Sequence, residues 1–411
     1  MEYKKREQKL LVLYKIKRNL NLNVNNSFEY NILKKEYIKY KKGNNIVTHR
    51  KQVRNRLFCF QLVIIFRLII QILPIKILSR IEYNLSKITL KIKGIGYKNI
   101  FGYDPSSSSN TFGSKYYPNV VNINGDEYTA NYSYYFNQEI NNVELIWNND
   151  IKSCKSMFRN CPDIIEVDLS DFNSDLVTTS MYMFSHCYSL TSINFGNFIT
   201  SKVTTMRSMF YHCYSLTSLN LNSFDTSNVL NMKNIFFNCS SLKSLDVSNF
   251  DTSKVTIMEY SFYQCSKLTS LNLSNFNTSV VTSMKSMFCN CESLKILDIC
   301  NFNTSKVTAM DYMFEEMHDL TSLDLRSFNT SKVTTMYAMF YHCASLTSLD
   351  LSSFDTSKVA DMSFMFSACF LLTSLDLSSF NISNTLLMKF MFELCKKLEY
   401  INFNNSYAKL C

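Results

Sequence analysis

Glycine, proline and tryptophan are scarce in this chain of 411 residues, which holds 7 Gly, 4 Pro and 1 Trp. No glycine-rich phosphate loop, no His-Glu-x-x-His motif and no Gly-x-Ser-x-Gly motif occurs in the sequence. Those motifs support phosphate binding, zinc-dependent hydrolysis and nucleophilic hydrolysis, respectively. We therefore expect a protein that is not an enzyme and that uses no cofactor.

What the chain has instead is a strict internal repeat. A phenylalanine recurs every 26 residues from Phe158 to Phe392 without an insertion or deletion, and a cysteine stands three residues after each Phe, with Met317 the one substitute. A fixed period of this length is typical of repeat proteins, in which each unit packs on its neighbours. The repeat predicts a solenoid of about ten coils over residues 151–411.

One coil, residues 332–354, carries two structural signals. Its first apolar residues have the i, i+3, i+4, i+7 spacing of a short helix, which Thr334 or Thr335 can cap. They are Met336, Met339, Phe340 and Cys343. Leu349 and Leu351 then alternate with polar residues, as in a strand with one buried face. The sequence therefore predicts an α/β solenoid of leucine-rich-repeat type, with a short parallel strand and a short helix in each coil.

The amino-acid sequence of the repeat resembles that of a known family. The string SLTSLDLSSFDTSKVADMSFMFSAC, residues 345–369, is similar to the repeat of the BspA-like leucine-rich-repeat surface proteins. A related repeat domain is common in lipoproteins of wall-less bacteria and in anaerobic eukaryotes. The resemblance covers residues 151–398, and it implies a surface-displayed protein that adheres to host proteins, matrix or other cells. It implies no catalytic residue.

Charge is distributed unevenly along the chain. The formal net charge is +10, but the first 100 residues are strongly basic and the remainder is net acidic. We predict a basic low-complexity leader at 1–56, a signal-anchor or transmembrane helix at 57–78, a small β cap at 79–150 and the solenoid at 151–411. Because the basic residues lie mainly outside the repeats, we do not expect nucleic-acid binding.

The segment at 57–78 decides the expected location. Its length suits a membrane span, although Arg67 in its middle makes insertion marginal. If it inserts, the basic residues before it keep the N-terminus cytosolic and place the repeats outside. We predict a cell-surface or extracellular protein anchored in the membrane. The alternative is a cytoplasmic scaffold for protein interactions whose apolar leader is buried or artefactual.

Cysteine and histidine recur in the repeat without forming an obvious metal motif. Nine of the 14 Cys share the apolar face with Phe and Met, so we predict buried thiols rather than disulfides. His186, His212 and His342 each precede a repeat Cys, but Asn, Gln, Glu, Ala or Leu fills that position in other coils. We therefore predict no metal site.

Carboxylates form the most suggestive surface column. The middle residue of each expected strand is Asp or Asn, and alternation places it on the exposed face. Four consecutive coils carry Asp298, Asp324, Asp350 and Asp376 at this position. Such carboxylates either raise one another's pKa or recruit a cation such as Ca²⁺, unless neighbouring Ser hydroxyls and backbone amides hold them.

The small polar residues around this column are interrupted in two successive coils. Ile296 and Arg326 stand there instead of Ser, and Glu315, Glu316 and His318 depart from the repeat at the expected helix edge. We predict that a protein or glycan ligand, whose identity the sequence does not give, binds at this face.

A second candidate is an aromatic patch in three other coils. Tyr211, Phe237 and Tyr263 each follow the repeat Phe. These rings either form an exposed patch for a partner or glycan, or pack between adjacent coils.

Overall fold

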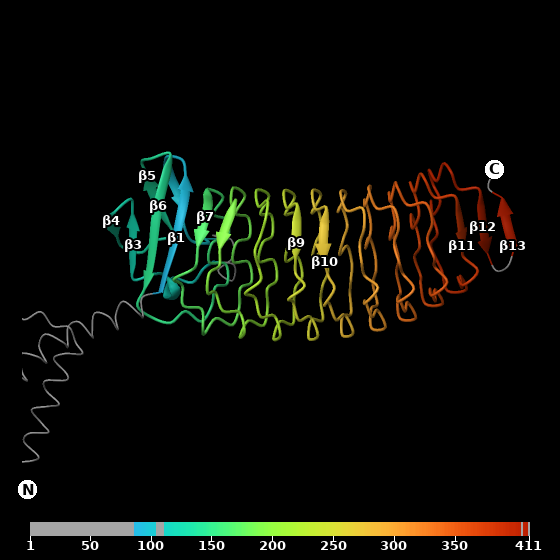
Figure 1. Ribbon diagram of the computed structural model, residues 1–411, viewed down its shortest axis with the longest axis horizontal. Helices are drawn as coiled ribbons and strands as arrows, with labels where there is room; N and C mark the ends of the chain where they lie inside the picture. Colours follow the sequence, from blue (N-terminus) through green and yellow to red (C-terminus); the bar gives the residue numbers. More distant parts are fainter. Residues whose placement is uncertain (1–85, 104–110, 404–405, 410–411) are drawn as a thin grey trace, which may run out of the picture. The chain divides into compact units, whose positions relative to one another are not determined.

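The computed structural model describes residues 86–103, 111–403 and 406–409 (Figure 1). The predicted leader at 1–56 and the predicted signal anchor at 57–78 lie outside these residues. Within the described part of the chain, no helix is long and apolar enough to cross a bilayer.

Antiparallel strands open the described part. They are β1 (Ser86–Lys93), β2 (Gly96–Asn99), β3 (Val120–Ile123), β4 (Asp126–Tyr128), β5 (Ser133–Phe136) and β6 (Ile140–Trp147), with a 3-10 turn η2 (Ser114–Tyr116) between β2 and β3. Asn124 and Gly125 join β3 to β4 with φ of 54° and 98°, as the tight turn of a hairpin requires.

β2 and β5 pair with each other, whereas β1, β3, β4 and β6 form a sheet that continues directly into the repeats. Its strand order is β4-β3-β6-β1-β7-β8, where β7 (Ile164–Asp168) and β8 (Ser192–Asn194) belong to the first coils. β1 pairs antiparallel with β6 on one side and with β7 on the other, whereas β7 and β8 pair in parallel. The antiparallel sheet therefore covers the edge that the first coil would otherwise leave unpaired.

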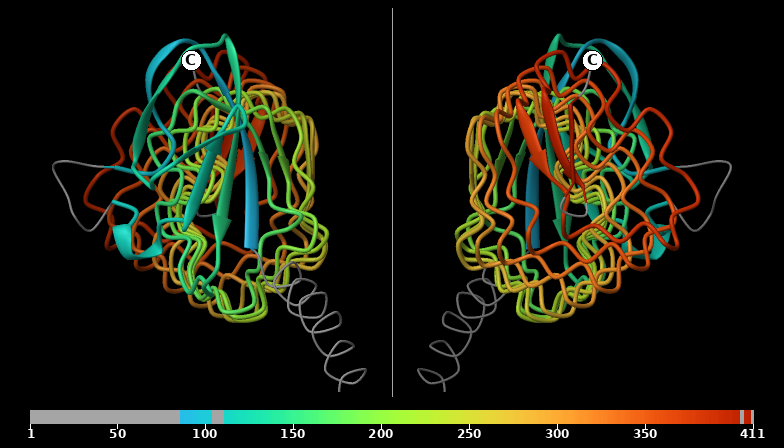
Figure 2. Two further views of the ribbon diagram at one scale, coloured as in Figure 1. Left: turned by 90° about the vertical axis from the view of Figure 1, so that its left-hand side faces the viewer. Right: turned by 90° about the vertical axis from the view of Figure 1, so that its right-hand side faces the viewer.

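The repeats form a stack of coils that follow one another in sequence order (Figure 1). The remaining strands are β9 (Ser244–Asp246), β10 (Ser270–Asn272), β11 (Ser374–Asp376), β12 (Tyr400–Phe403) and β13 (Ser406–Lys409). On another side of the coils, isolated parallel bridges link corresponding residues of neighbouring coils from Thr179 to Leu387. Viewed along the stack, most of the coils lie nearly behind one another (Figure 2).

The predicted α/β solenoid with a helix in each coil is wrong. Among the described residues, η2 is the single helical element, and no coil contains a helix. The segment 336–343, predicted as a helix, consists of consecutive tight turns in which Ala338 and His342 have φ of 51° and 56°. Thr334, predicted as a cap, donates its backbone N–H to the carbonyl of Thr308 in the preceding coil.

The hydrogen bonds explain why turns replace the helix. Met339 donates its N–H to the carbonyl of Met336 in a turn, while the N–H of Phe340 reaches the carbonyl of Met365 in the next coil at 2.9 Å. Backbone donors therefore alternate between their own coil and the neighbouring one, so every coil satisfies its neighbour's carbonyls. Successive four-residue turns bring the same residues to the inside as a helix would, which is why the two produce the same apolar spacing.

Columns of identical side chains fill the interior. The Phe column stacks from Phe158 to Phe392 with ring centroids 5.5–6.0 Å apart. The repeat cysteines are free, and all but the half-buried Cys395 are buried, which confirms the predicted thiols. Most donate a hydrogen bond to a Phe carbonyl of the previous coil, as Cys343 does to Phe314 at 3.0 Å.

A buried threonine column adds polar links between the coils. The hydroxyl of Thr330 donates to the carbonyl of Asp355 at 2.9 Å and accepts from the N–H of the same residue at 2.8 Å. The same double contact recurs at Thr200, Thr252, Thr278, Thr304 and Thr356. Each coil is thus tied to the next by packing and by satisfied buried polar groups.

Candidate functional site

The predicted carboxylate column lies on an exposed face of the stack. Asp298, Asp324, Asp350 and Asp376 are all exposed, and the residues on either side of each are buried. Each carboxylate accepts the N–H of the residue two positions later, at 2.9–3.2 Å. The Asp side chains therefore close local turns along the strand edge.

Three carboxylates of this column have a lowered pKa, whereas mutual repulsion would raise it. Hydrogen bonds from Ser352 hold the pKa of Asp350 below its ordinary value, and those from Ser378 do the same for the pKa of Asp376. Hydrogen bonds from Arg326 lower the pKa of Asp324 to about 2. For these three carboxylates, local donors outweigh any repulsion along the column, so their pKa values do not rise. Of the two expectations for this column, the one in which Ser hydroxyls and backbone amides hold the carboxylates is confirmed for Asp350 and Asp376.

Two residues predicted to interrupt this face stand out from it. Ile296 is 75% exposed, whereas the coils beside it carry Ser at this position. Arg326 points its guanidinium at Asp324 in a two-pronged contact of 3.0 and 2.6 Å, and Cys300 beside Asp298 is exposed. We call Ile296, Asp298, Cys300, Asp324 and Arg326 the strand-face break.

The predicted aromatic patch is a ladder of stacked rings. Tyr211 and Phe237 lie with ring centroids 4.5 Å apart, and Phe237 and Tyr263 repeat that distance. All three side chains are half-buried. Burial raises the pKa of both Tyr211 and Tyr263. Packing between coils therefore accounts for the buried part of these rings.

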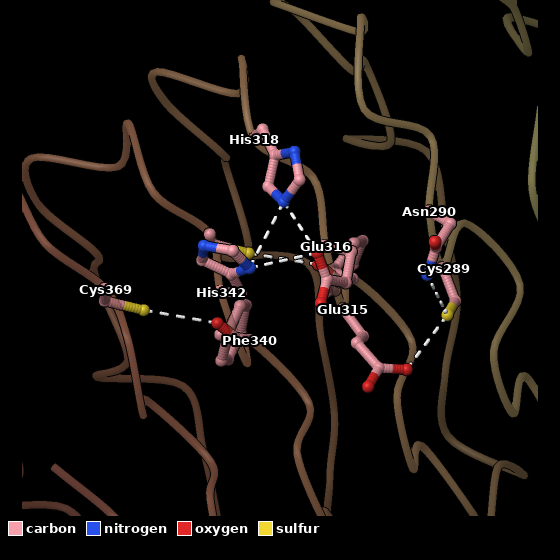
Figure 3. Close-up of polar contacts among 10 residues, drawn as sticks. Cys289, Asn290, Glu315, Glu316, His318, Phe340, His342 and Cys369 are labelled. Atoms are coloured by element: carbon pink, nitrogen blue, oxygen red, sulfur yellow. Dashed lines mark hydrogen bonds and ion pairs between the residues drawn. The ribbon is translucent and has the colours of Figure 1, made fainter. Parts of the chain in front are cut away.

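In the next two coils, the position of this aromatic ladder is occupied by residues that are not aromatic. Cys289 and Glu315 follow Tyr263 at intervals of one coil, and the Cys289 thiol donates to Glu315 Oε2 at 3.0 Å. Burial raises the pKa of the Glu315 carboxyl. Figure 3 shows the Glu315 side chain directed at Cys289, away from the histidines beside it.

Glu316, His318 and His342 form a cluster that we call the His-Glu cluster (Figure 3). Glu316 Oε2 lies 2.6 Å from His318 Nε2 and 3.0 Å from His342 Nδ1. The two histidine nitrogens are 3.2 Å apart. These three side chains are the single group of three or more His, Cys, Asp or Glu ligands within metal-binding distance in the described part of the chain.

The repeat itself brings the cluster together. Glu316 and His342 occupy the same position in successive coils, both in the left-handed region with φ of 57° and 56°. The N–H of Glu316 donates to the carbonyl of Tyr341 at 2.8 Å, so the backbone bonds between coils fix their separation. His318 follows two residues later in the coil where Met317 replaces the repeat Cys.

The sequence singles out each of these three residues, but it does not predict that they contact one another. Glu316 and His318 were recognised as departures from the repeat, and His342 as a member of a histidine column. The prediction of no metal site treated Glu316 as one of several residues that fill this column. The signal that could have found the cluster is the succession of Glu and His in one column with a second His two residues after the Glu.

The comparisons with known proteins agree with the repeat. A family model described as "Mycoplasma protein of unknown function, DUF285" matches residues 127–244, 216–322 and 283–406. No curated protein and no solved structure matches the chain significantly. Because the overlapping matches together cover more than half of the 411 residues, the chain belongs to the DUF285 family of Mycoplasma proteins of unknown function.

Proposed function

We propose that this protein is a non-enzymatic binding or adhesion module that presents the exposed strand face of its repeats to a protein or glycan ligand. The observation that carries the proposal is the strand-face break. A 75%-exposed Ile296 and the Arg326–Asp324 pair stand there in a row of otherwise small polar side chains. Arginine is enriched among the residues that contribute most to binding at protein interfaces, and an exposed aliphatic side chain offers apolar area that a ligand can bury.

The regularity of the rest of the face supports the same function. Ser270, Ser322 and Ser348 occupy the position of Ile296 in neighbouring coils, and the Asp/Asn column continues on both sides. Such a surface offers the same small contacts many times, so a ligand with a repeating structure would gain affinity through multivalency. The strand-face break would then set the register of the ligand.

The likeness of residues 345–369 to BspA-like surface repeats supports display at a cell surface, which is part of this proposal. The segment at 57–78 would serve as the membrane anchor, with the repeats outside. Protease treatment of intact cells that express the full chain with a C-terminal tag tests this location. Digestion of the repeats from outside supports surface display, whereas full protection would favour the alternative of an intracellular scaffold.

Binding is tested with the full chain on an immobilised extracellular-matrix extract and on cultured animal cells. Ile296→Ser and Arg326→Ser restore the residue type that other coils carry at these positions, so both variants should fold. Because burial of one large aliphatic side chain contributes about 1.5–3 kcal/mol, Ile296→Ser should weaken binding about tenfold or more.

Leu230→Thr is the matched control. Leu230 is also an exposed aliphatic side chain, at 49%, and Thr204 and Thr256 occupy its position in the adjacent coils. This variant should bind as the unchanged chain does. Equal binding by Ile296→Ser and the unchanged chain would remove the strand-face break from the proposal.

A further inference from the structure

We propose that Glu316, His318 and His342 form a binding site for one divalent transition-metal ion, with Zn²⁺ as the best match. Nothing in the repeat pattern or in the family description assigns such a site. The site lies outside the strand-face break, so it goes beyond the proposed binding function.

The contacts within the His-Glu cluster cannot all be hydrogen bonds at once. A carboxylate oxygen accepts only, and each histidine nitrogen either donates or accepts. If both nitrogens carry a proton and donate to Glu316, the 3.2 Å contact between the nitrogens of His318 and His342 joins two donors. If only one carries a proton, the other nitrogen faces the carboxylate lone pair to lone pair. A cation at the centre satisfies all three atoms together.

The distances suit a small tetrahedral ion. Zinc binds histidine nitrogen at about 2.0–2.1 Å and carboxylate oxygen at about 2.0–2.2 Å, so tetrahedral ligand atoms lie about 3.3 Å apart. The three atoms here are separated by 2.6, 3.0 and 3.2 Å. Small side-chain rotations that move each ligand atom by a few tenths of an ångström therefore bring the three atoms to the separation that the ion needs.

The ligand types select the class of metal. Two imidazoles with one carboxylate suit Zn²⁺, Co²⁺, Ni²⁺ or Cu²⁺, whereas Ca²⁺ and Mg²⁺ prefer sites made of oxygen atoms. Two histidines and a glutamate are also the protein ligands of several zinc sites that keep one position open. The site is thus of a different kind from the cation-bridged carboxylate face considered for the strands.

The fold holds these ligands in place before any metal arrives. The N–H of His342 donates to the carbonyl of Ser367 at 2.8 Å, and its ring lies edge-on against Phe370 at 5.4 Å. The rings of His318 and His342 pack at 4.5 Å with an angle of 66° between them. Ligands that are already ordered lose little conformational entropy on binding.

An ion can reach the cluster from solvent. The side chains of His318, Glu316 and His342 are 34%, 27% and 30% exposed. Three ligands from this chain leave a tetrahedral ion with one free position. Water, or a side chain of a bound partner, would fill it.

A second histidine pair in the same columns lacks the carboxylate and provides the control. His186 and His212 lie with ring centroids 5.1 Å apart, and burial lowers the pKa of His186 to about 4. Burial also lowers the pKa of His212, whose Nδ1 has no hydrogen-bond partner. The lowered pKa values favour the neutral form of both rings.

Zn²⁺ titration by calorimetry on the full chain tests the proposal, with Co²⁺ absorption as a second readout of tetrahedral binding. All variants carry Cys300→Ser, because Cys300 is an exposed thiol and Ser274 and Ser352 occupy its position in neighbouring coils. The variants are His318→Ser, Glu316→Gln and His342→Asn, with His212→Asn as control. Each introduces a residue type found at the same position in another coil, so the fold should persist.

We expect binding of about one ion per chain at the cluster. Loss of a histidine ligand should weaken this binding more than the roughly 10–100-fold seen for the outer residues that orient metal ligands. Glu316→Gln should weaken it less than either histidine variant does, and His212→Asn should leave it unchanged. No Zn²⁺ binding, or equal binding in His318→Ser and the unchanged cluster, would overturn the proposal. If His342→Asn fails to fold, His318→Ser decides the result, because its side chain is a third exposed.

Discussion

Two kinds of residue column in the coils differ in how often the residue type changes from one coil to the next. One kind lies in the interior, and the other is the outer column of left-handed residues. Inside, Phe occupies its position from Phe158 to Phe392 without exception, and Cys gives way once, to Met317. Outside, the column that contains Glu316 and His342 also carries Asn, Gln, Ala and Leu in other coils. Whatever its side chain, each residue of this outer column has a φ of 56–63°.

This difference separates the residues that make the frame from those free to vary. A Phe that stacks on both neighbours cannot change without leaving a cavity that two coils share. A residue on the outside keeps its left-handed backbone whatever its side chain, because the hydrogen bonds between coils hold the turn. New chemistry can therefore arise on the outside by single substitutions without loss of the fold.

The largest effect should come from Phe340→Ala. Phe340 is fully buried and stacks on Phe314 at 5.5 Å and on Phe366 at 5.7 Å. Removal of such a ring costs about 3–5 kcal/mol of unfolding free energy. Tyr341→Ser is the control, since Ser185 and Ser367 occupy that position, and it should cost less than about 1 kcal/mol. Urea unfolding compares them, and equal losses would break the distinction between inside and outside.

An intermediate effect is expected for Thr330→Val. The change keeps the shape of this fully buried residue but leaves the N–H and carbonyl of Asp355 without their partner. An unsatisfied buried polar group costs about 1–3 kcal/mol. Thr334→Val should change stability by less than about 0.5 kcal/mol, because that threonine is exposed. Urea unfolding with no difference between the two would show that the threonine column does not link the coils.

The smallest effect concerns the exposed carboxylates. Because the pKa of Asp324 falls from 3.8 to about 2 in the folded chain, this group stabilises the fold above pH 3.8. That contribution is lost as the pH falls towards 2. In Arg326→Ser the pKa of Asp324 should rise above about 2 but stay below 3.8, because Ser at this position also donates to the carboxylate, as Ser352 does to Asp350. The pKa of Asp376, lowered by Ser378, should not move. NMR titration of labelled Asp carboxyls checks both, and an unmoved Asp324 would contradict the assigned cause.

The pattern of burial could be predicted from the sequence, but the backbone conformation of the coils could not. Nearly all Phe, Leu and Cys positions that were expected inside are buried, although Phe392 and Cys395 are half-buried. Asp298 and Asp324 are exposed as strand alternation predicts. The helix prediction was wrong because tight turns also place residues 336, 339, 340 and 343 inside. Non-glycine residues such as Ala338 and His342 rarely adopt positive φ, so the sequence gave no warning of these turns.

The His-Glu cluster escaped prediction for a related reason. His342 lies 24 and 26 residues along the chain from His318 and Glu316, and only a stack that superimposes successive coils brings it to them. A single coil shows one His beside one Glu, a common surface pair. The pattern that predicts the cluster, a Glu and a His at the same position of successive coils, is visible only when two coils are compared position by position.

The central claim is that the coils provide one fixed frame and that outer residues alone decide whether a site is present. It is tested most directly by building a second His-Glu cluster five coils earlier, where native His212 corresponds to His342. The double variant His186→Glu with Tyr188→His supplies the other two ligands at the positions that correspond to Glu316 and His318. Calorimetry with Zn²⁺ should then show about two ions bound per folded chain, where the unchanged chain binds about one. A folded double variant that still binds the same number of ions as the unchanged chain would contradict the claim.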